Sequence, residues 1–334
     1  MNTPTPHPVL FVGGSGLVGR HAVRALRRLQ PDLPIAIGGR DLDKAQRLAG
    51  DIGNAAALRI DLERADLGLP HGTQYSGVVV LLKDDTLNTM KYAQDHGLPY
   101  LSFADFVFDI GPLTARSIHR PKASAVLALG QLLGGTVALA TLHFARAYRR
   151  VDSVEIAAVI DADDSGGPAG QADFERLAHS PRPLLRREGR FVWAGDEHLK
   201  RRFIDVDGIE RTGDTLPLLD VASLSAALDA QSVRVVMAAR GDGERRQGGR
   251  STEAIIELQG QRADGTTGRS RHAMVDRNVY SALSGYGAAI AVERLLGLDG
   301  QAPPGPGLYQ PESLLDPAAV VQRLQRLEVE LRDA

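Results

Sequence analysis

The feature that most constrains the fold is a short apolar run that passes through glycines into a helical pattern. Val9–Val12 is wholly apolar, and the next seven residues, GGSGLVG, contain four glycines. From Leu17 to Leu29, apolar side chains recur near helical spacing. A strand that turns this sharply into a helix gathers backbone N–H groups at one point, and glycines keep Cβ atoms away from it. The pattern predicts a strand–turn–helix unit that accepts the phosphates of a nucleotide.

Two glycine templates overlap in this turn. Gly14, Gly16 and Gly19 give G-x-G-x-x-G, and Gly13 replaces Gly14 in G-x-x-G-x-x-G. The alternative is a plain tight turn. However, the glycine segment lies between the first strand and the first helix, and this position favours a cofactor site. We predict that the site includes the whole turn: Gly13, Gly14, Ser15, Gly16, Leu17, Val18 and Gly19.

The end of the second predicted strand indicates which dinucleotide is preferred. In folds that prefer NAD, an acidic side chain here binds the ribose 2′-hydroxyl. In this chain Gly39 leaves space and Arg40 follows, so a guanidinium is available for the 2′-phosphate of NADP, with Lys44 one helical turn further on. Two alternatives remain: Asp41 reaches the ribose, as NAD requires, or Arg40 lies in water. We predict NADP as the cofactor, with NAD possible.

Two further strands end in polar residues that suit the same site. Asp61 follows the third strand, where it lies beside the adenine or is a plain polar strand end. Leu82 and Lys83 end the fourth strand, VVVLLK, at the sheet edge where the nicotinamide half of the cofactor lies. Lys83 either holds the nicotinamide ribose or substrate, or is a solvated strand end.

The first third of the chain alternates strand-like and helix-like segments. This alternation predicts βαβ units and a parallel sheet. The expected strands are Val9–Val12, Ile35–Ile37, Leu58–Ile60, Val78–Leu82, Leu98–Phe103 and Ala125–Leu129, and the expected helices are Leu17–Leu29, Leu42–Ile52 and Thr86–His96.

After about residue 125 the predicted strands become longer and more alternating. They favour an antiparallel or mixed sheet with helices on one face, an α+β domain. The expected strands are Val151–Ile160, Arg201–Val206, Ser232–Ala239, Thr252–Gln259 and Arg269–Val275, and the expected helices are Gly134–Arg149, Arg277–Leu296 and Asp316–Glu330.

Composition excludes several classes of protein. The 334-residue chain has a formal net charge of −2, which disfavours binding to nucleic acid or to an acidic membrane surface. It has no cysteine, which excludes disulfides, thiolate metal ligands and cysteine nucleophiles. We see neither a signal-peptide pattern at the start nor a run of about 18 apolar residues, so we expect a cytoplasmic protein without a membrane span.

Other catalytic motifs are missing from the sequence. No tyrosine is followed four residues later by lysine, as short-chain dehydrogenases need, and neither H-E-x-x-H nor G-x-S-x-G occurs. The scattered histidines predict no metal site. His143 lies in an apolar helix, where packing is favoured over an acid–base role.

Four segments of the chain resemble the saccharopine dehydrogenase-like NAD(P)-binding oxidoreductases. They are VLFVGGSGLVGR from Val9, IAIGGRDLDKAQRLA from Ile35, GLPYLSFAD from Gly97 and GLYQPESLLDPAAVVQRL from Gly307. The chain departs from the family at Ser102, where an aspartate is usual, and at Lys83 and Asp84, where a Gly-Pro step is common.

The resemblance implies a Rossmann fold, a doubly wound parallel sheet, with a second α+β domain inserted before a returning C-terminal segment. The implied dinucleotide-binding domain covers residues 1–125 and about 300–334, and the substrate and dimerisation domain covers about 126–299. It also implies a homodimer formed through the second domain. The implied activity is hydride transfer to or from a C–N centre, imine or secondary amine, of an amino-acid-like small molecule, with Lys83 and Asp105 as candidate catalytic residues. The alternative is an NADP-binding redox sensor or regulatory protein without turnover.

Overall fold

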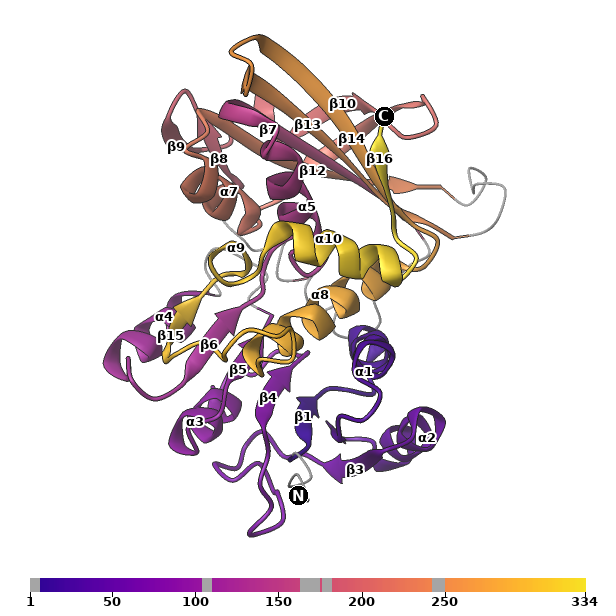
Figure 1. Cartoon of the computed structure of the whole chain (residues 1–334), viewed down its shortest axis with the longest axis vertical. Helices are drawn as coiled ribbons and strands as arrows, with labels where there is room; N and C mark the ends of the chain where they lie inside the picture. The colour runs from indigo at the N-terminus through magenta and orange to yellow at the C-terminus, as the bar shows by residue number, and fades with distance from the viewer. Residues whose placement is uncertain (1–6, 104–109, 163–174, 176–181, 242–249) are drawn as a thin grey trace. The chain divides into compact units, whose positions relative to one another are not determined.

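The chain forms two compact units, each built on its own sheet. The computed structural model describes residues 7–103, 110–162, 175, 182–241 and 250–334. The first unit comprises Met1–Ala104, Phe108–Leu129 and Ser284–Leu314, and the second comprises Asp105–Val107, Gly130–Leu283 and Leu315–Ala334 (Figure 1). The domain limits expected from the sequence stay a prediction.

The first unit contains a 7-stranded sheet in the order β15-β6-β5-β4-β1-β2-β3. All of its pairs are parallel. The strands are β1 (Val9–Val12), β2 (Ile35–Gly39), β3 (Ala55–Arg59), β4 (Gly77–Val80), β5 (Tyr100–Ser102), β6 (Ala125–Ala128) and β15 (Gly307–Tyr309). The order 3-2-1-4-5-6 is that of the doubly wound dinucleotide-binding fold. Its direction reverses between β1 and β4, where such sheets bind ligands at the carboxyl ends of their strands.

The helices of this unit follow the predicted alternation. They are α1 (Leu17–Leu29), α2 (Leu42–Ile52), α3 (Asn88–Asp95), α4 (Ile110–His119) and the short α9 (Pro311–Leu314). The bounds of β1, α1 and α2 equal those predicted, whereas β3 begins at Ala55, before the expected Leu58. In α1 the buried side chains Ala22, Val23, Ala25 and Leu26 share one face, so the sheet covers the apolar stripe of the helix.

A later helix also packs on α1. It is α8 (Tyr280–Leu295), whose residues from Ser284 onward belong to the first unit. A Cβ added to Gly285 would lie 2.7 Å from the backbone nitrogen of Ala22, so the two helices touch backbone to backbone. The amide of Gln30 donates to the buried carboxylate of Glu293 at 2.7 Å.

The second unit contains a 9-stranded mixed sheet whose main path is β10-β11-β12-β7-β13-β14-β16, while β8 pairs with β12 and β9 pairs with β8. Only the β12–β7 pair of this sheet is parallel among the described residues. The strands are β7 (Tyr148–Asp161), β8 (Leu184–Arg187), β9 (Arg190–Trp193), β10 (Lys200–Ile204), β11 (Glu210–Thr215), β12 (Ser232–Arg240), β13 (Thr252–Arg262), β14 (Thr267–Asp276) and β16 (Glu330–Asp333). With helices α5 (Thr136–Ala145), α7 (Asp220–Leu228) and α10 (Pro317–Arg326), this unit confirms the predicted α+β class.

The C-terminal helix is shorter than the sequence pattern predicts. Asp316–Glu330 was expected as one helix, but α10 ends at Arg326. Glu328 has a φ of 70°, a left-handed conformation that stops a helix. The chain then pairs as β16 with β14, so Glu330 is a strand residue.

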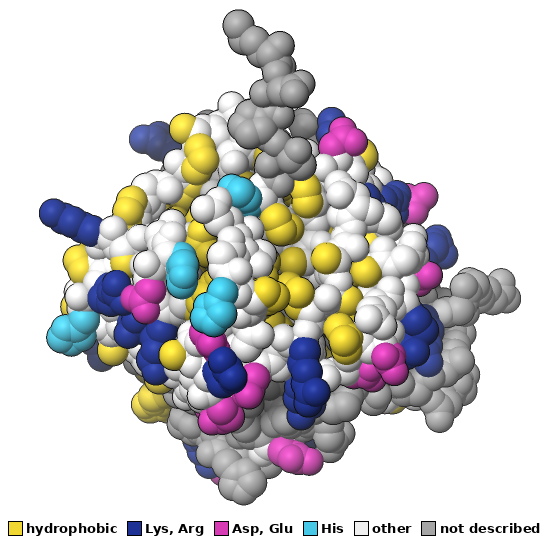
Figure 2. Space-filling view, turned by 90° about the horizontal axis from the view of Figure 1, so that it is seen from below, with side chains coloured by type: hydrophobic (Ala, Val, Ile, Leu, Met, Phe, Trp, Pro, Cys, Tyr) yellow, Lys and Arg dark blue, Asp and Glu magenta, His cyan; other side chains and the backbone are white. Residues whose placement is uncertain are grey.

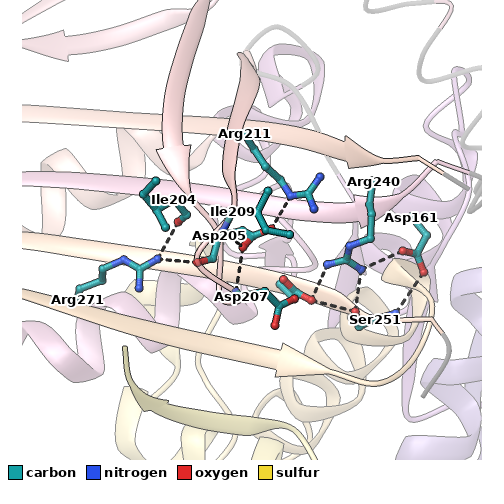
Figure 3. Close-up of polar contacts among 10 residues, drawn as sticks. Asp161, Ile204, Asp205, Asp207, Ile209, Arg211, Arg240, Ser251 and Arg271 are labelled. Carbon is teal, nitrogen blue, oxygen red and sulfur yellow. Dashed lines mark hydrogen bonds and ion pairs between the residues drawn. The ribbon is translucent and has the colours of Figure 1, made fainter. Parts of the chain in front are cut away.

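The β10–β11 hairpin packs over the face of the sheet opposite the buried Ile156. Phe203 and Val206 contact an apolar cluster of Ala157, Val159, Val236 and Ile255. At its tip the carboxylate of Asp205 is fully buried and accepts hydrogen bonds from Arg211 and two backbone N–H groups (Figure 3). Burial opposes ionisation, but these donors outweigh it and lower the pKa of Asp205.

A buried ionic cluster joins the ends of β7, β12 and β13. The guanidinium of Arg240 donates to Asp161 at 3.0 Å, to Ser251 at 2.9 Å and to Glu253 at 2.6 Å (Figure 3). The side chains of Arg240, Asp161 and Glu253 are no more than 3% exposed. Because the charges are paired and hydrogen-bonded, burial is tolerated, and removing one partner leaves a charge without its counter-ion.

The surface mixes charges of both signs. On the face in Figure 2, the described Lys and Arg side chains lie among Asp and Glu side chains, with apolar side chains between them. Among the helices of the described residues, none combines the length and the apolar character that crossing a bilayer requires.

Candidate nucleotide-binding site

The glycine turn after β1 places the start of α1 at the reversal of strand order. Gly13 has a φ of 81°, which favours glycine, and its N–H donates to the carbonyl of Gly38 on β2 at 2.8 Å. The N-cap of α1, Gly16, makes no side-chain cap hydrogen bond, and the first turn contains no acidic residue. The N–H groups of that turn therefore form a site for an anion, which the helix dipole favours.

The glycines of the turn are required by close packing. A Cβ on Gly19 would meet the carbonyl oxygen of Gly13 and lie 2.6 Å from the carbonyl carbon of Gly14. A Cβ on Gly14 would lie 2.9 Å from Cβ of Phe11. A side chain at either position would force α1 away from the turn. These close contacts agree with the prediction that glycines are needed here to keep Cβ atoms out of the turn.

Strand ends on both sides of β1 meet this turn. A Cβ on Gly13 would lie 3.1 Å from a methyl carbon of Leu82, just after β4, and one on Gly39, at the end of β2, would lie 3.4 Å from Oγ of Ser15. The structure therefore brings together four of the predicted cofactor residues at one edge of the sheet. Leu17, Val18 and Gly19 follow in the first turn of α1.

The two charged residues that follow β2, Arg40 and Asp41, differ in their hydrogen bonds. Arg40 is exposed, and no hydrogen bond or ion pair joins it to any other described residue. Asp41 is the N-cap of α2, and its carboxylate accepts from the backbone N–H of Lys44 at 2.9 Å. The side chain of Lys44 is exposed on the first turn of α2. Asp41 is thus held by its own helix, which leaves Arg40 as the charged group at the strand end.

Asp61 lies in a loop after β3 that contacts the loop after β4. Its exposed carboxylate accepts from the N–H of Glu63 at 3.1 Å. The next residue, Leu62, accepts at its carbonyl from Thr86 at 3.2 Å and from Asn88 at 2.8 Å. The two loops are therefore fixed to each other, and Asp61 has a defined position near the carboxyl edge of the sheet.

A buried carboxylate next to Lys83, that of Asp84, organises the segment after β4 and was not predicted as a site residue. Asp84 accepts from the N–H and hydroxyl groups of both Thr86 and Thr89, at 2.6–3.1 Å. Thr89 also bonds the hydroxyl of Tyr100 on β5, at 3.1 Å. Burial raises the pKa of Tyr100 to about 12, so this hydroxyl stays protonated. An aspartate followed by threonines between a strand and a helix is the sequence pattern that could have predicted this network.

The two predicted catalytic residues differ in what the structure says of them. Lys83 is exposed next to Leu82 in the segment after β4, which ends at Val80 and not at Lys83 as predicted. Asp105 lies outside the described residues. Ser102, which stands where the family usually has an aspartate, is buried at the end of β5. The described residues thus supply close-packed glycines at the start of α1 and, from Lys83, an exposed amine after β4.

Comparison with known proteins supports the fold. No protein-family model matches the chain, and no curated protein matches it. Apo saccharopine dehydrogenase (L-Glu forming) from Saccharomyces cerevisiae has a similar structure, with a TM-score of 0.66 and 14% identity over 98% of this chain and 100% of that one. A putative myo-inositol dehydrogenase from Sinorhizobium meliloti 1021 is more distant, with a TM-score of 0.49 and 10% identity over 98% and 99% of the two chains. The fold of this chain is therefore similar to that of saccharopine dehydrogenase, as its sequence predicts.

Proposed function

We propose that this protein is an NADP-dependent oxidoreductase. The observation that carries the proposal is the uncapped start of α1, reached through close-packed glycines at the point where the strand order reverses. This is where doubly wound folds bind the pyrophosphate of a dinucleotide. The similarity of fold to saccharopine dehydrogenase supports a redox role for that dinucleotide.

The preference for NADP rests on the end of β2. A 2′-phosphate needs a cation, and Arg40 is exposed there without a partner among the described residues. NAD would need a carboxylate at this place, but Asp41 already accepts from the first turn of α2. Gly39, buried against Ser15, has no side chain to occupy the space beside the ribose.

The proposed reaction is hydride transfer to or from a carbon bonded to nitrogen in an amino-acid-like substrate. Bound NADP supplies or accepts the hydride at its nicotinamide ring. Lys83 is proposed to hold the nicotinamide ribose or the substrate, and Asp105 to exchange the proton on the substrate nitrogen. The family resemblance supports this substrate class, as does the similarity of fold to saccharopine dehydrogenase (L-Glu forming).

Nucleotide titration tests the proposal. NADPH and NADH are titrated, by nicotinamide fluorescence, into the wild type, Arg40→Ala and Arg47→Ala, which removes an exposed arginine of α2. We expect Arg40→Ala to weaken NADPH binding by about 1.5–3 kcal/mol, the usual worth of a hydrogen bond to a charged group, and to leave NADH unchanged. Arg47→Ala should change neither. If the wild type binds neither nucleotide, the proposed function is wrong. If it binds NADH more tightly, only the preference is wrong.

Two further points of the proposal have their own measurements. Binding of NADPH without turnover on a panel of imines, amines and ketones would favour an NADP-binding sensor over an enzyme. We also propose a homodimer formed through the second unit. Light scattering of the purified chain should then give twice the 35.8 kDa mass of one chain, and a monomer would contradict it.

A further inference from the structure

The second unit contains an open cavity of about 510 Å³, within the usual range for small-molecule sites. Its polar lining includes a hydroxyl, two imidazoles, a guanidinium and a carboxylate, from Ser270, His143, His272, Arg262 and Asp333. All of these residues belong to the second unit, so the cavity is separate from the glycine turn.

Hydrogen bonds join three of these side chains in a row. Nδ1 of His272 lies 2.7 Å from the carboxylate of Asp333, and Nε2 lies 2.9 Å from Oγ of Ser270. An ionised carboxylate only accepts, so the ring proton lies on Nδ1 and Nε2 accepts from the serine hydroxyl. This is the pattern of bonds through which a serine, a histidine and an aspartate make a nucleophile.

The sheet places these groups without help from a local motif. Ser270 and His272 are two residues apart on β14, so their side chains lie on the same face of the sheet. Asp333 of β16 is the register partner of His272. The three residues come from two strands that are far apart in the sequence. The motif G-x-S-x-G does not occur around Ser270, because His272 stands in place of the second glycine.

The imidazole is held in plane and kept neutral. The ring of Phe144, on α5, stacks on His272 with centroids 3.9 Å apart and an angle of 3° between the rings. Burial lowers the pKa of His272, and the charges of Arg262 and His143 lower it further, while the hydrogen bond and charge of Asp333 act in the opposite direction. A neutral ring at pH 7 is the form that accepts a proton.

We propose that Ser270, His272 and Asp333 form a nucleophilic site that hydrolyses small carboxylic esters in the cavity beside them. Oγ of Ser270 attacks the ester carbonyl carbon as its proton passes to Nε2 of His272. The bond to the alcohol breaks, and the alcohol leaves with that proton. Water then attacks the acyl-serine by the same route, which releases the carboxylic acid and restores the hydroxyl.

Donors for the developing oxyanion lie beside the serine. The hydroxyl of Tyr148 donates to Oγ of Ser270 at 2.9 Å. The guanidinium carbon of Arg262 lies 5.6 Å from the centre of the Tyr148 ring. The phenol of Tyr148 next to the serine, and the cation of Arg262 in the lining of the same cavity, suit a negative charge that forms only during attack. The exposed carboxylate of Asp333, 90% accessible, leaves the mouth of the site open to water.

Labelling with a fluorophosphonate and hydrolysis of 4-nitrophenyl acetate test this site in the full-length protein. The variants are Ser270→Ala, Asp333→Asn and Ser153→Ala, which removes a serine of β7 outside the cavity. We expect labelling of the wild type and of Ser153→Ala and none of Ser270→Ala. Hydrolysis by Asp333→Asn should fall by about 100-fold or more, because the wrong tautomer is then populated. Fluorescence of Trp193, the chain's single tryptophan, reports whether each variant folds.

The pH profile separates catalysis from a structural role. The charged and titratable groups that act on His272 or line its cavity include Asp333 on β16, Arg262 on β13, Arg271 on β14 and His143 on α5. Hydrolysis by the wild type should rise with pH and reach its plateau with a midpoint below 6.5, since the pKa of His272 is lowered. A wild type that is not labelled, labelling that persists in Ser270→Ala, or a flat profile each overturns the proposal. Asp333→Asn lies at the chain end, so it keeps the test valid if Ser270→Ala does not fold. None of these outcomes depends on nucleotide binding.

Discussion

The two units differ in the polar groups that we single out in each of them. In the first, the candidate site is made by the backbone: close-packed glycines and the uncapped N–H groups of α1. In the second, the polar groups are side chains, buried in the Arg240 cluster and in the Asp205–Arg211 pair. A site made of backbone shape is broken by adding atoms, whereas a buried ionic cluster is broken by removing them.

The largest expected effect comes from breaking the cluster of the second unit. Arg240→Met leaves Asp161 and Glu253 buried without their cation and should lower the free energy of unfolding by about 3–5 kcal/mol. Arg201→Met, the control, breaks a partly exposed pair with Glu155 and should cost less than about 1 kcal/mol. Denaturant unfolding measures both. Equal losses in the two variants would contradict the distinction between buried and exposed pairs.

The next effect comes from adding one methyl group to the first unit. Gly19→Ala places a Cβ against the carbonyls of Gly13 and Gly14, so α1 must move away from the turn. We expect a loss of about 2–4 kcal/mol of stability, at the upper end of overpacking costs, and no measurable NADPH binding. Arg240→Met, where it remains folded, should bind NADPH normally. An unchanged nucleotide affinity in Gly19→Ala would remove the glycine turn from the site.

The same difference explains what the sequence predicted. The glycine turn, β1, α1 and α2 depend on neighbours along the chain, and the bounds of these elements were predicted correctly. Asp161 and Arg240 are 79 positions apart, and no local pattern links them. Likewise β11, with the sequence ERTGDT, has no apolar alternation and was not predicted, because its partners β10 and β12 provide its hydrogen bonds.

Within the nucleotide-binding site, too, features that depend on neighbours along the chain were predicted, and contacts between distant residues were not. Gly13 was predicted from the glycine pattern, and Gly39 and Leu82 from the positions of strand ends. The structure brings all three to one edge of the sheet. The whole network of Asp84 was not predicted, because Tyr100 joins it through Thr89 only after β4 and β5 pair. The proposed preference for NADP depends on Arg40, and the titration tests it.

Acidification should affect the two units in opposite directions. Burial, with Arg20 and Arg24 nearby, lowers the pKa of His21 in the first unit to about 4. Its contribution to stability is therefore present above pH 6.5 and lost as the pH falls through 4. Burial raises the pKa of Asp276 in the second unit to about 6. Its contribution is present below pH 3.8 and lost as the pH rises through 6.

Variants separate the two contributions. Each is on the order of 2 kcal/mol, after allowance for the partial exposure of His21. His21→Gln should remove the loss of stability on acidification that belongs to the first unit, and Asp276→Asn should remove the gain that belongs to the second. Unfolding is measured from pH 7 to pH 4. If both variants change the pH profile in the same direction, one of these two assignments is wrong.

The smallest expected effect tests whether every glycine of the first unit has a structural role. Gly50 lies inside α2 with nothing within 4 Å of an added Cβ, so Gly50→Ala should raise stability by about 0.5–1 kcal/mol through lower backbone entropy. Gly53, which ends the same helix, has equal space but a φ of 63°, so Gly53→Ala should lower stability by about 1 kcal/mol. Thermal unfolding of the two variants measures this difference in sign. If Gly50→Ala raises the melting temperature and Gly53→Ala lowers it, backbone conformation decides the effect of an added methyl group at these two positions. At Gly19, by contrast, contact with neighbouring atoms decides it. Shifts of the same sign in the two variants would contradict this explanation.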